Sequence, residues 1–357
     1  MRYLGIDVHS AASVWCLLDA EGQQVEEGKV PTTAPALRSL VERLAAGDEL
    51  LVGQEVGTLA YFVHDVVAAA KVRILSFNAQ QLRMIASSRK KTDRRDAYWI
   101  ARALQTGMMP HPVYIPTDEV RRLRGLLARR EALVRDRRRW VVRARTHLRA
   151  AGLKPRRGLR AGTAAVAAVL ERPEGADAWL LEALELCGRM EGTLAAELAT
   201  VEATIRRETK DQAVIERLRT IPAVGERVAT TIYACVGDVR RFPTARTLTS
   251  YAGLVPSVWQ SGQAARTGGI TKQGAPALRA VLVQAGHVLM GRCRSPEAEP
   301  LRRIVERIHG GRGRRKIAVV AAARHLLRVA FYVWRDGTVY DPSRLSGAAD
   351  REIPEAA

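Results

Sequence analysis

The chain has 357 residues, 47% of them hydrophobic, which is enough for two domains or one large domain with a substantial core. Its 57 lysines and arginines against 37 aspartates and glutamates give a net charge of +20, so the expected partners are polyanions, nucleic acid before an anionic membrane. The sequence lacks an uncharged apolar stretch near about 18 residues, a signal-peptide pattern and any Cys-x-x-Cys pair, which argues against a membrane span, secretion and a zinc ribbon and favours the cytoplasm.

Residues 1–112 alternate between short apolar runs and stretches of helical spacing. The runs predict strands over residues 3–8, 13–19, 24–30, 50–56 and 72–77, and the helical spacing predicts helices over residues 34–44, 59–70, 79–86 and 93–105. This order resembles the α/β RNase H-like fold, in the version of RuvC-type Holliday-junction resolvases. In such a sheet the first and fourth strands can lie side by side.

Four acids are predicted to meet in this domain. Asp7 lies inside an apolar strand, where a carboxylate is costly to bury unless it is paired or bound to a metal. Glu55 ends the fourth strand, next to Asp7 in the expected sheet. Asp93 and Asp96 stand three residues apart and project from one face of the last helix. Acids so grouped suit a divalent metal that must meet a phosphate.

Each of these acids also has an ordinary interpretation. Asp7 could be a buried, hydrogen-bonded aspartate, Glu55 a solvated strand end, and Asp93 a helix N-cap followed by solvated charges. His9 and His64 lie near the acids in sequence, but such histidines are usually surface or packing residues, so both are left outside the predicted site. The cations around the helical pair are Lys90, Lys91, Arg94 and Arg95.

The middle of the chain is strongly basic. Residues 121–160 contain 16 lysines or arginines and two acids, a net charge of +14. Apolar residues recur at heptad spacing there and again over residues 178–209, which predicts two long amphipathic helices in a coiled-coil region. Because a solvated charge run would mix signs, phosphate contact is favoured over solubility alone. The arginines assigned to nucleic acid are Arg121, Arg122, Arg129, Arg130, Arg137, Arg138, Arg139 and Arg143.

Two motifs follow in residues 211–275. Residues 218–228 read L-R-T-I-P-A-V-G-E-R-V, which resembles the hairpin of a helix-hairpin-helix motif that offers backbone N–H groups to a phosphate; the alternative is an ordinary turn between helices. Residues 257–274 read as a glycine-rich basic loop. In it Ser261 could approach a phosphodiester closely, beside Arg266 and Lys272, although most Ser-Gly pairs are simple turns.

The last hundred residues return to basic helices. Residues 301–328 are basic and include a glycine-arginine tract over 310–316, which suits contact with an RNA or DNA backbone. Residues 343–357 are predicted to be a disordered tail. The tract supplies four further nucleic-acid-binding candidates, Arg312, Arg314, Arg315 and Lys316.

The motifs follow one another in a specific order. Gly5-Ile6-Asp7, Glu55, K-T-D-x-x-D, I-P-x-V-G, G-D-x-R-R-F, G-L-V-P, Ser-Gly and G-G-I-T-K-x-G resemble the DEDD-type transposases of insertion sequences, over roughly residues 2–290. Relatives of that family include pilin-gene invertases and bridge-RNA-guided recombinases. The resemblance implies an acidic tetrad of Asp7, Glu55, Asp93 and Asp96 and a nucleophilic serine at Ser261. Many members have a second serine just before it; this chain has Gln260 there, so Ser257 is the alternative nucleophile.

The resemblance also implies an architecture and partners. The expected parts are a RuvC-like domain over residues 1–112, a helical coiled-coil region over 113–210 and a mainly α transposase domain over 211–342. The expected cofactor is Mg²⁺, one or two ions on the four acids. The expected partners are donor and target DNA duplexes, a structured non-coding guide RNA and further copies of the chain in a dimer or tetramer, with no membrane. The expected location is the bacterial cytoplasm, at the nucleoid when active.

We therefore interpret the sequence as a transposase that excises and inserts DNA by serine attack on phosphodiesters. A junction resolvase with the same acids and water as the nucleophile explains residues 1–112 but leaves Ser261 without a role. A non-enzymatic nucleic-acid binder explains the charge but not Asp7 among three further acids.

Overall fold

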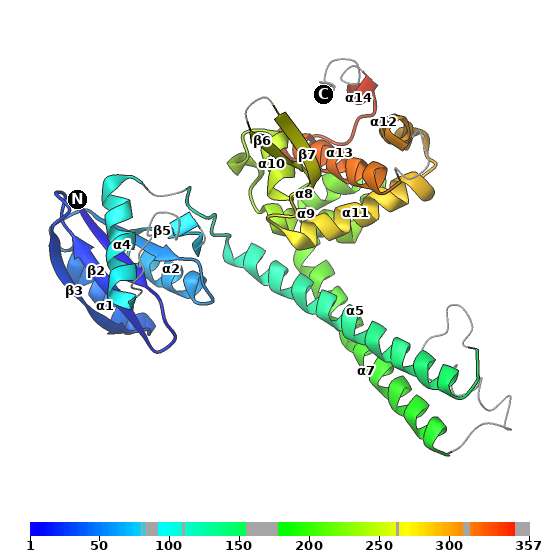
Figure 1. Cartoon of the computed structure of the whole chain (residues 1–357), viewed down its shortest axis with the longest axis horizontal. Coiled ribbons are helices and arrows are strands. Elements are labelled where there is room, and N and C mark those ends of the chain that lie inside the picture. The colour runs from blue at the N-terminus through cyan, green and yellow to red at the C-terminus, as the bar shows by residue number, and fades with distance from the viewer. Residues whose placement is uncertain are drawn as a thin grey trace. The chain divides into compact units, whose positions relative to one another are not determined.

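The computed structural model describes residues 1–79, 81–82, 92–108, 111–154, 178–261, 264–309 and 315–346 (Figure 1). The chain forms two compact units, Met1–Pro116 and Thr117–Ala357. The finer division predicted at residues 112, 210 and 342 stays a prediction.

The N-terminal unit is built on one mixed five-stranded sheet. Its strands are β1 (Arg2–Asp7), β2 (Ala12–Leu18), β3 (Gln24–Pro31), β4 (Leu50–Glu55) and β5 (Arg73–Phe77), in the spatial order β3-β2-β1-β4-β5. β1 runs antiparallel to β2 and parallel to β4, so the first and fourth strands lie side by side, as predicted. This arrangement is compatible with an RNase H-like fold.

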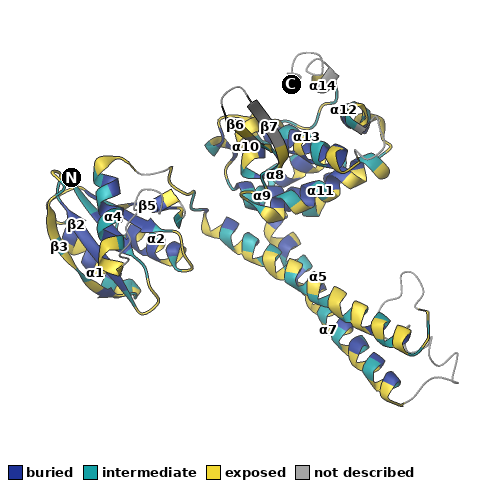
Figure 2. Ribbon diagram, viewed as in Figure 1, coloured by how far each residue is buried: buried dark blue, intermediate teal, exposed yellow. Residues whose placement is uncertain are grey.

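Side chains alternate between the two faces of this sheet. Leu4 and Ile6 of β1 belong to the core formed with α1 (Ala34–Ala45) and α2 (Ala60–Ala69). The opposite face is covered by α4 (Asp93–Thr106), and β1, β2 and β4 between these layers are largely buried, whereas the edge strand β3 is mostly exposed (Figure 2). By this alternation, the side chains of Asp7 in β1 and Glu55 in β4 lie on the face of the sheet that α4 covers. The helix predicted over 79–86 lies largely outside the described residues.

Two long helices begin the second unit. α5 (Asp118–Ala150) and α7 (Ala178–Thr209) pack along one another (Figure 1). Their heptad positions meet in two buried clusters, one around Leu148 and Leu184 and one around Leu123 and Val201. Both predicted helices are present, and their coiled-coil geometry stays a prediction. Residues 155–177 between them lie outside the description.

The remainder of the second unit is mainly helical around one core. In this core α13 carries buried Leu326, Leu327 and Phe331. α13 is also long and apolar enough to cross a membrane, but 56% of its apolar window is buried in the protein, as in core helices generally. The helices are α8 (Ala213–Arg219), α9 (Glu226–Val236), α10 (Ala245–Tyr251), α11 (Pro276–Gly291), α12 (Glu299–His309), α13 (Arg315–Asp336) and α14 (Ser343–Ser346), with short 3₁₀ helices at Val239–Arg241 and Pro296–Ala298.

Two predictions for this part were wrong. The stretch predicted as a loop contains a β-hairpin of β6 (Pro256–Ser261) and β7 (Ala264–Ile270), in which Ser261 pairs with Ala264. Its glycines suggested irregular backbone, but extended strands tolerate glycine where the partner strand supplies hydrogen bonds. The predicted disordered tail begins with helix α14, and residues 347–357 lie outside the description.

Candidate functional site

Two paired glycines seat α4 on the sheet. Gly5 of β1 is the register partner of Gly53 of β4. A Cβ atom on Gly5 would lie 2.1 Å from the Ala97 carbonyl oxygen, and one on Gly53 would lie 2.7 Å from the Leu104 side chain. Because only hydrogen occupies these positions, the α4 backbone approaches the strands closely. The first turn of α4, which carries Asp93 and Asp96, is thereby held near the end of β1.

Asp7, His9 and Asp93 form the centre of the candidate site. His9 Nε2 lies 3.0 Å from Asp7 Oδ2 and 3.5 Å from Asp93 Oδ2. One ligand atom from each of the three residues lies within 4.8 Å of the others. The Asp7 side chain is 16% exposed and that of Asp93 58% exposed, so the cluster is open to solvent on the α4 side.

Electrostatics at Asp7 disfavour its charge. Burial raises the pKa of the Asp7 carboxyl above its ordinary value, the hydrogen-bonded His9 opposes that rise, and the nearby Asp96 and Asp93 add to it. Asp96 is therefore close enough to interact with Asp7. A cation among these carboxylates would remove their mutual repulsion.

The structure brings the four predicted acids together unequally. Asp93 lies in the close group with Asp7. Asp96 belongs to the same first turn of α4 and interacts with Asp7 electrostatically. Glu55 ends the strand that pairs with β1, one residue beyond the Ile6–Gln54 register pair, and is not in the close group found among the described residues.

His9, which the sequence analysis left outside the predicted site, lies against two of its aspartates, and a role as a ligand stays a hypothesis. His9 is 47% exposed and contacts both aspartates. Its two-residue offset from Asp7, just past the end of β1, was the available signal. Two carboxylates and an imidazole are a donor set that divalent metals accept, with carboxylates suiting Mg²⁺ and imidazole suiting transition metals. The residues present therefore fit a divalent metal.

The glycine seat makes a first prediction. Gly5→Ala should lower the free energy of unfolding of the N-terminal unit by about 1–3 kcal/mol, because the new Cβ must displace backbone of α4. DNA cleavage should also fall, by more than the loss of folded protein explains, because a shift of α4 moves Asp93 and Asp96 away from Asp7. Gly57→Ala is the matched control, because a Cβ there meets nothing within 4 Å. Chemical denaturation and a cleavage assay on both variants measure this; equal behaviour of the two would contradict the seat.

The β6–β7 hairpin holds the predicted serine. Its base is closed by Gly253 and Gly274, which have φ of +65° and +78° and whose Cβ atoms would lie 2.2 and 1.9 Å from backbone oxygens of Gln273 and Tyr251. These contacts explain why both the G-L-V-P and the G-G-I-T-K-x-G motifs carry glycine there. Ser261 is the last residue of β6.

The side chains beside Ser261 have different surroundings. Ser257 Oγ donates a hydrogen bond of 2.9 Å to the Gly269 carbonyl. Lys272 is exposed and has a φ of +56°, so it lies at a turn. The side chains of Ser261 and Arg266 lie outside the description.

Three of the arginines predicted to bind nucleic acid form ion pairs between the two long helices, and their contact with nucleic acid stays a prediction. Arg130 Nη2 lies 2.7 Å from Glu202, Arg137 Nε 2.5 Å from Glu191 and Arg129 Nη2 2.9 Å from Glu197. Acids on α7 thus neutralise part of the arginine face of α5. Arg121 and Arg139 pair within α5 at 3.5 and 2.8 Å, with Asp118 and Asp136. The exposed members of the set are Arg122, Arg129, Arg138, Arg139 and Arg143.

This division of the arginines makes a second prediction. Arg138→Ala should reduce the slope of log affinity for DNA against log salt by about 1, because it removes one phosphate contact. Arg130→Ala should leave that slope nearly unchanged and lower the free energy of unfolding by about 1–3 kcal/mol, because Glu202 loses its partner. Binding titrations at several salt concentrations and denaturation curves separate the two effects. The same slope change in both variants would show that the ion pair opens on DNA.

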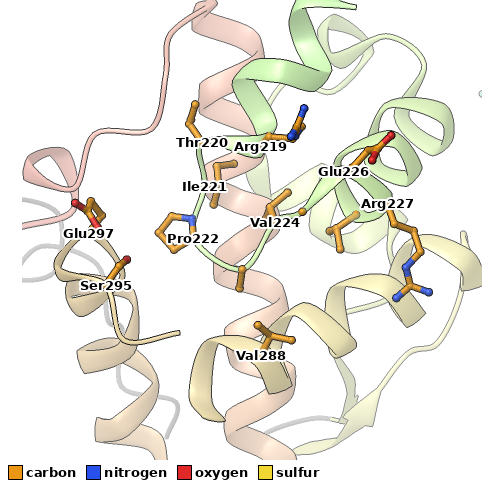
Figure 3. Close-up of a pocket in the computed structure, with 13 residues that line it drawn as sticks. Arg219, Thr220, Ile221, Pro222, Val224, Glu226, Arg227, Val288, Ser295 and Glu297 are labelled. Carbon is orange, nitrogen blue, oxygen red and sulfur yellow. The ribbon is translucent and has the colours of Figure 1, made fainter. Parts of the chain in front are cut away.

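The I-P-x-V-G hairpin joins α8 to α9 above a cavity of about 730 Å³ (Figure 3). Ile221 and Val224 are buried, and Ala223 has a φ of +66°. The lining mixes charges: Arg219 and Arg227 contribute cations, and Glu226 and Glu297 contribute acids. The two predicted helices and their tight turn are present, and phosphate contact by this hairpin stays a prediction.

The C-terminal basic tract lies only partly within the description. Arg315 and Lys316 are exposed in the first turn of α13. Arg312 and Arg314 lie outside the described residues. Phosphate contact by the tract stays a prediction.

Two family models match the chain. A model for the DEDD-type transposase of IS110 matches residues 4–152, the region that carries the four acids. A model described as a transposase of the IS116/IS110/IS902 family matches residues 215–301, the region that carries Ser261. The two matches together span more than half of the chain.

Curated proteins give the same family. The chain is 28% identical over 303 residues to the transposase for insertion sequence element IS1328 of Yersinia enterocolitica, covering 84% of this chain and 88% of that protein. It is 29% identical over 263 residues to a probable family 20 transposase of Pseudomonas aeruginosa, covering 71% and 75%. It is 28% identical over 400 residues to an IS110 protein of Streptomyces coelicolor, covering 97% and 96%. The chain therefore belongs to the DEDD-type transposases of the IS110 family, enzymes that act on DNA.

Proposed function

We propose that this transposase excises and inserts its element by attack of a serine hydroxyl on DNA phosphodiesters, assisted by Mg²⁺. The observation that carries the proposal is the close group of Asp7, His9 and Asp93 under the first turn of α4, with Asp96 beside it. Such a group at the end of β1 suits a metal and the phosphate that the metal meets. Ser261 supplies the second half of the chemistry from the β6–β7 hairpin.

The N-terminal residues bind and orient the scissile phosphate. Asp7, Asp93 and Asp96 would hold the metal, with Glu55 at the end of β4 as a fourth ligand. His9, between two carboxylates, keeps Asp7 and Asp93 at a fixed separation and could enter the ligand set. A divalent cation bound there would polarise the phosphoryl oxygens and lower the pKa of an attacking hydroxyl.

Ser261 carries the covalent step. Its hydroxyl gives up its proton as its oxygen bonds to phosphorus, the phosphorus–oxygen bond to one deoxyribose breaks, and that sugar oxygen takes up a proton, so no net proton is consumed. The phosphodiester energy is kept in the phosphoserine bond, so the strand can be rejoined without ATP. Lys272, exposed at the base of the hairpin, is a candidate for contact with the backbone of the bound strand away from the cut. Ser257 donates its hydrogen bond within the hairpin, which supports Ser261 as the nucleophile.

We further propose that sequence choice belongs to a structured RNA encoded beside the gene. The net charge of +20 and the exposed arginines of α5 support backbone contacts with nucleic acid. In such a system base pairing reads the sequence and the protein reads backbone shape. The acids and Ser261 lie in different compact units, and we propose an oligomer in which one subunit's acids serve another subunit's Ser261.

A cleavage assay tests this function. We expect purified protein, supplied with Mg²⁺ and the transcript flanking its gene, to cleave DNA carrying the element end and to remain attached to it. Omission of the metal should abolish cleavage, and omission of the transcript should abolish site selectivity. The resolvase alternative predicts cleavage of a four-way junction with free DNA ends and no attached protein. RNA-free protein that cleaves the correct site would contradict guidance but not the serine chemistry.

A further inference from the structure

The β6–β7 hairpin presents an unusually open tryptophan. Trp259 is 65% exposed, although a side chain of this size normally buries most of its surface. It lies two residues before the end of β6 and pairs with Arg266 of β7 in the strand register. Single exposed apolar residues are common on proteins, so exposure alone assigns no role.

The ring of Trp259 is held in place rather than free. A Cβ atom on Gly268 would lie 2.5 Å from Cζ3 of the ring and 2.7 Å from Ser257 Oγ, so the ring rests directly over a glycine of the facing strand. Ser257 in turn is bonded to the Gly269 carbonyl. Below these residues Arg279 Nη1 donates to the Ala252 carbonyl at 2.9 Å and closes the base of the hairpin. One part of the ring is thus supported by backbone and the rest faces solvent.

The surroundings specify what such a ring would bind. Lys272 is exposed at the base of the same hairpin, and the chain carries a net charge of +20. A supported aromatic face on a strongly basic protein is suited to stacking a nucleobase while cations elsewhere on the protein meet the backbone. Ser261 follows Trp259 by two positions on the same strand, a backbone distance of about 7 Å. That distance is close to the length of one nucleotide of extended DNA.

We propose that Trp259 is a stacking platform for an unpaired base of the DNA substrate, in the nucleotide next to the phosphodiester that is cut. The position of the stacked base beside the cut phosphodiester rests on the proposed role of Ser261. The stacking itself does not depend on that role. Stacking holds the strand at the hairpin without reading the base, because every base has a π face.

The test is a binding cycle on the full-length protein in EDTA, so that no strand is cut. The probe is a fluorescein-labelled single strand of the element end, together with a series in which one nucleotide near the cut is replaced by an abasic site. We expect Trp259→Ala to weaken binding of the intact probe about tenfold and Trp259→Phe to restore most of it. The probe that lacks the stacked base should bind the wild-type protein about tenfold more weakly than the intact probe does. Its affinity for Trp259→Ala should be no lower than its affinity for the wild-type protein.

Two matched controls separate the ring from its neighbourhood. Gly268→Ala keeps the tryptophan but pushes its ring aside and should reproduce part of the loss, whereas Gly269→Ala, whose Cβ meets nothing within 4 Å, should bind as wild type. Trp179→Ala removes a comparably exposed tryptophan, 61% exposed on α7, and its effect should not depend on the abasic position.

The outcomes of this binding experiment can be told apart from those of the cleavage assay that tests the proposed function. Undiminished binding by Trp259→Ala, or an equal loss on every abasic probe, would overturn the platform. A loss of affinity of Trp259→Ala for the transcript flanking the gene, measured without DNA, together with unchanged DNA binding, would assign Trp259 to RNA and also overturn it. If Ser261→Ala still forms a covalent adduct while Trp259→Ala shows the expected losses, the assignment of Ser261 as the nucleophile fails and the stacking site stands.

Discussion

Ser261→Ala protein should bind element-end DNA with unchanged affinity and form no covalent adduct. The reason is that a covalent phosphoserine keeps the energy of the cut phosphodiester for rejoining, whereas attack by water would lose it. The measurement is a denaturing gel of protein with labelled DNA and Mg²⁺. Wild type should give a slowly migrating protein–DNA band, and Ser261→Ala should give none, a loss limited only by detection.

Ser257→Ala is the matched control for this experiment. Ser257 lies on the same strand, but its hydroxyl donates to the Gly269 carbonyl, so its removal should loosen the hairpin without removing the nucleophile. We expect it to retain the covalent band at reduced yield. A band that disappears only in Ser257→Ala would make Ser257 the nucleophile. Normal cleavage by Ser261→Ala without attached protein would favour the resolvase mechanism with water.

Asp7→Asn should lower DNA cleavage by at least about 100-fold while leaving nucleic-acid binding nearly intact. Changes in residues that merely orient metal ligands cost 10- to 100-fold, and the loss of a carboxylate ligand should cost at least about as much. The amide also takes away the charge that faces His9 Nε2 at 3.0 Å. Cleavage is measured over a range of Mg²⁺ concentrations, and binding is measured separately in EDTA.

Asp65→Asn is the control for that variant. Asp65 also contacts a histidine, His64 Nδ1 at 3.3 Å, but it lies on α2, outside the close group. We expect it to cleave as wild type does. Full cleavage by Asp7→Asn would refute the metal site. Mixing Asp7→Asn with Ser261→Ala protein should restore some cleavage if acids and serine come from different subunits; a mixture that stays inactive would place both on one subunit.

The sequence by itself determined most of the secondary structure of the N-terminal unit and the order of its strands. Apolar alternation along residues 1–77 is a local property, so β1 to β5 each appear within one residue of their predicted ends. The position of Asp7 inside an apolar run and the spacing of Asp93 and Asp96 were also legible, because both depend on the chain near each residue. The order of motifs was enough to predict the family that the comparisons confirm.

What only the tertiary structure decided were the contacts between residues far apart in sequence. His9 contacts Asp93, 84 positions away in sequence, because the paired glycines Gly5 and Gly53 let α4 pack closely on the sheet. The sequence around either glycine does not predict this packing. In the basic middle, charge counts predicted phosphate contacts, yet acids of α7 engage Arg130 and Arg137, because two helices that pack along each other align their charges. Likewise Ser257 and Trp259 acquire their surroundings from Gly268 and Gly269 on the facing strand. Local pattern sets what each element is, whereas long-range packing sets which side chains meet.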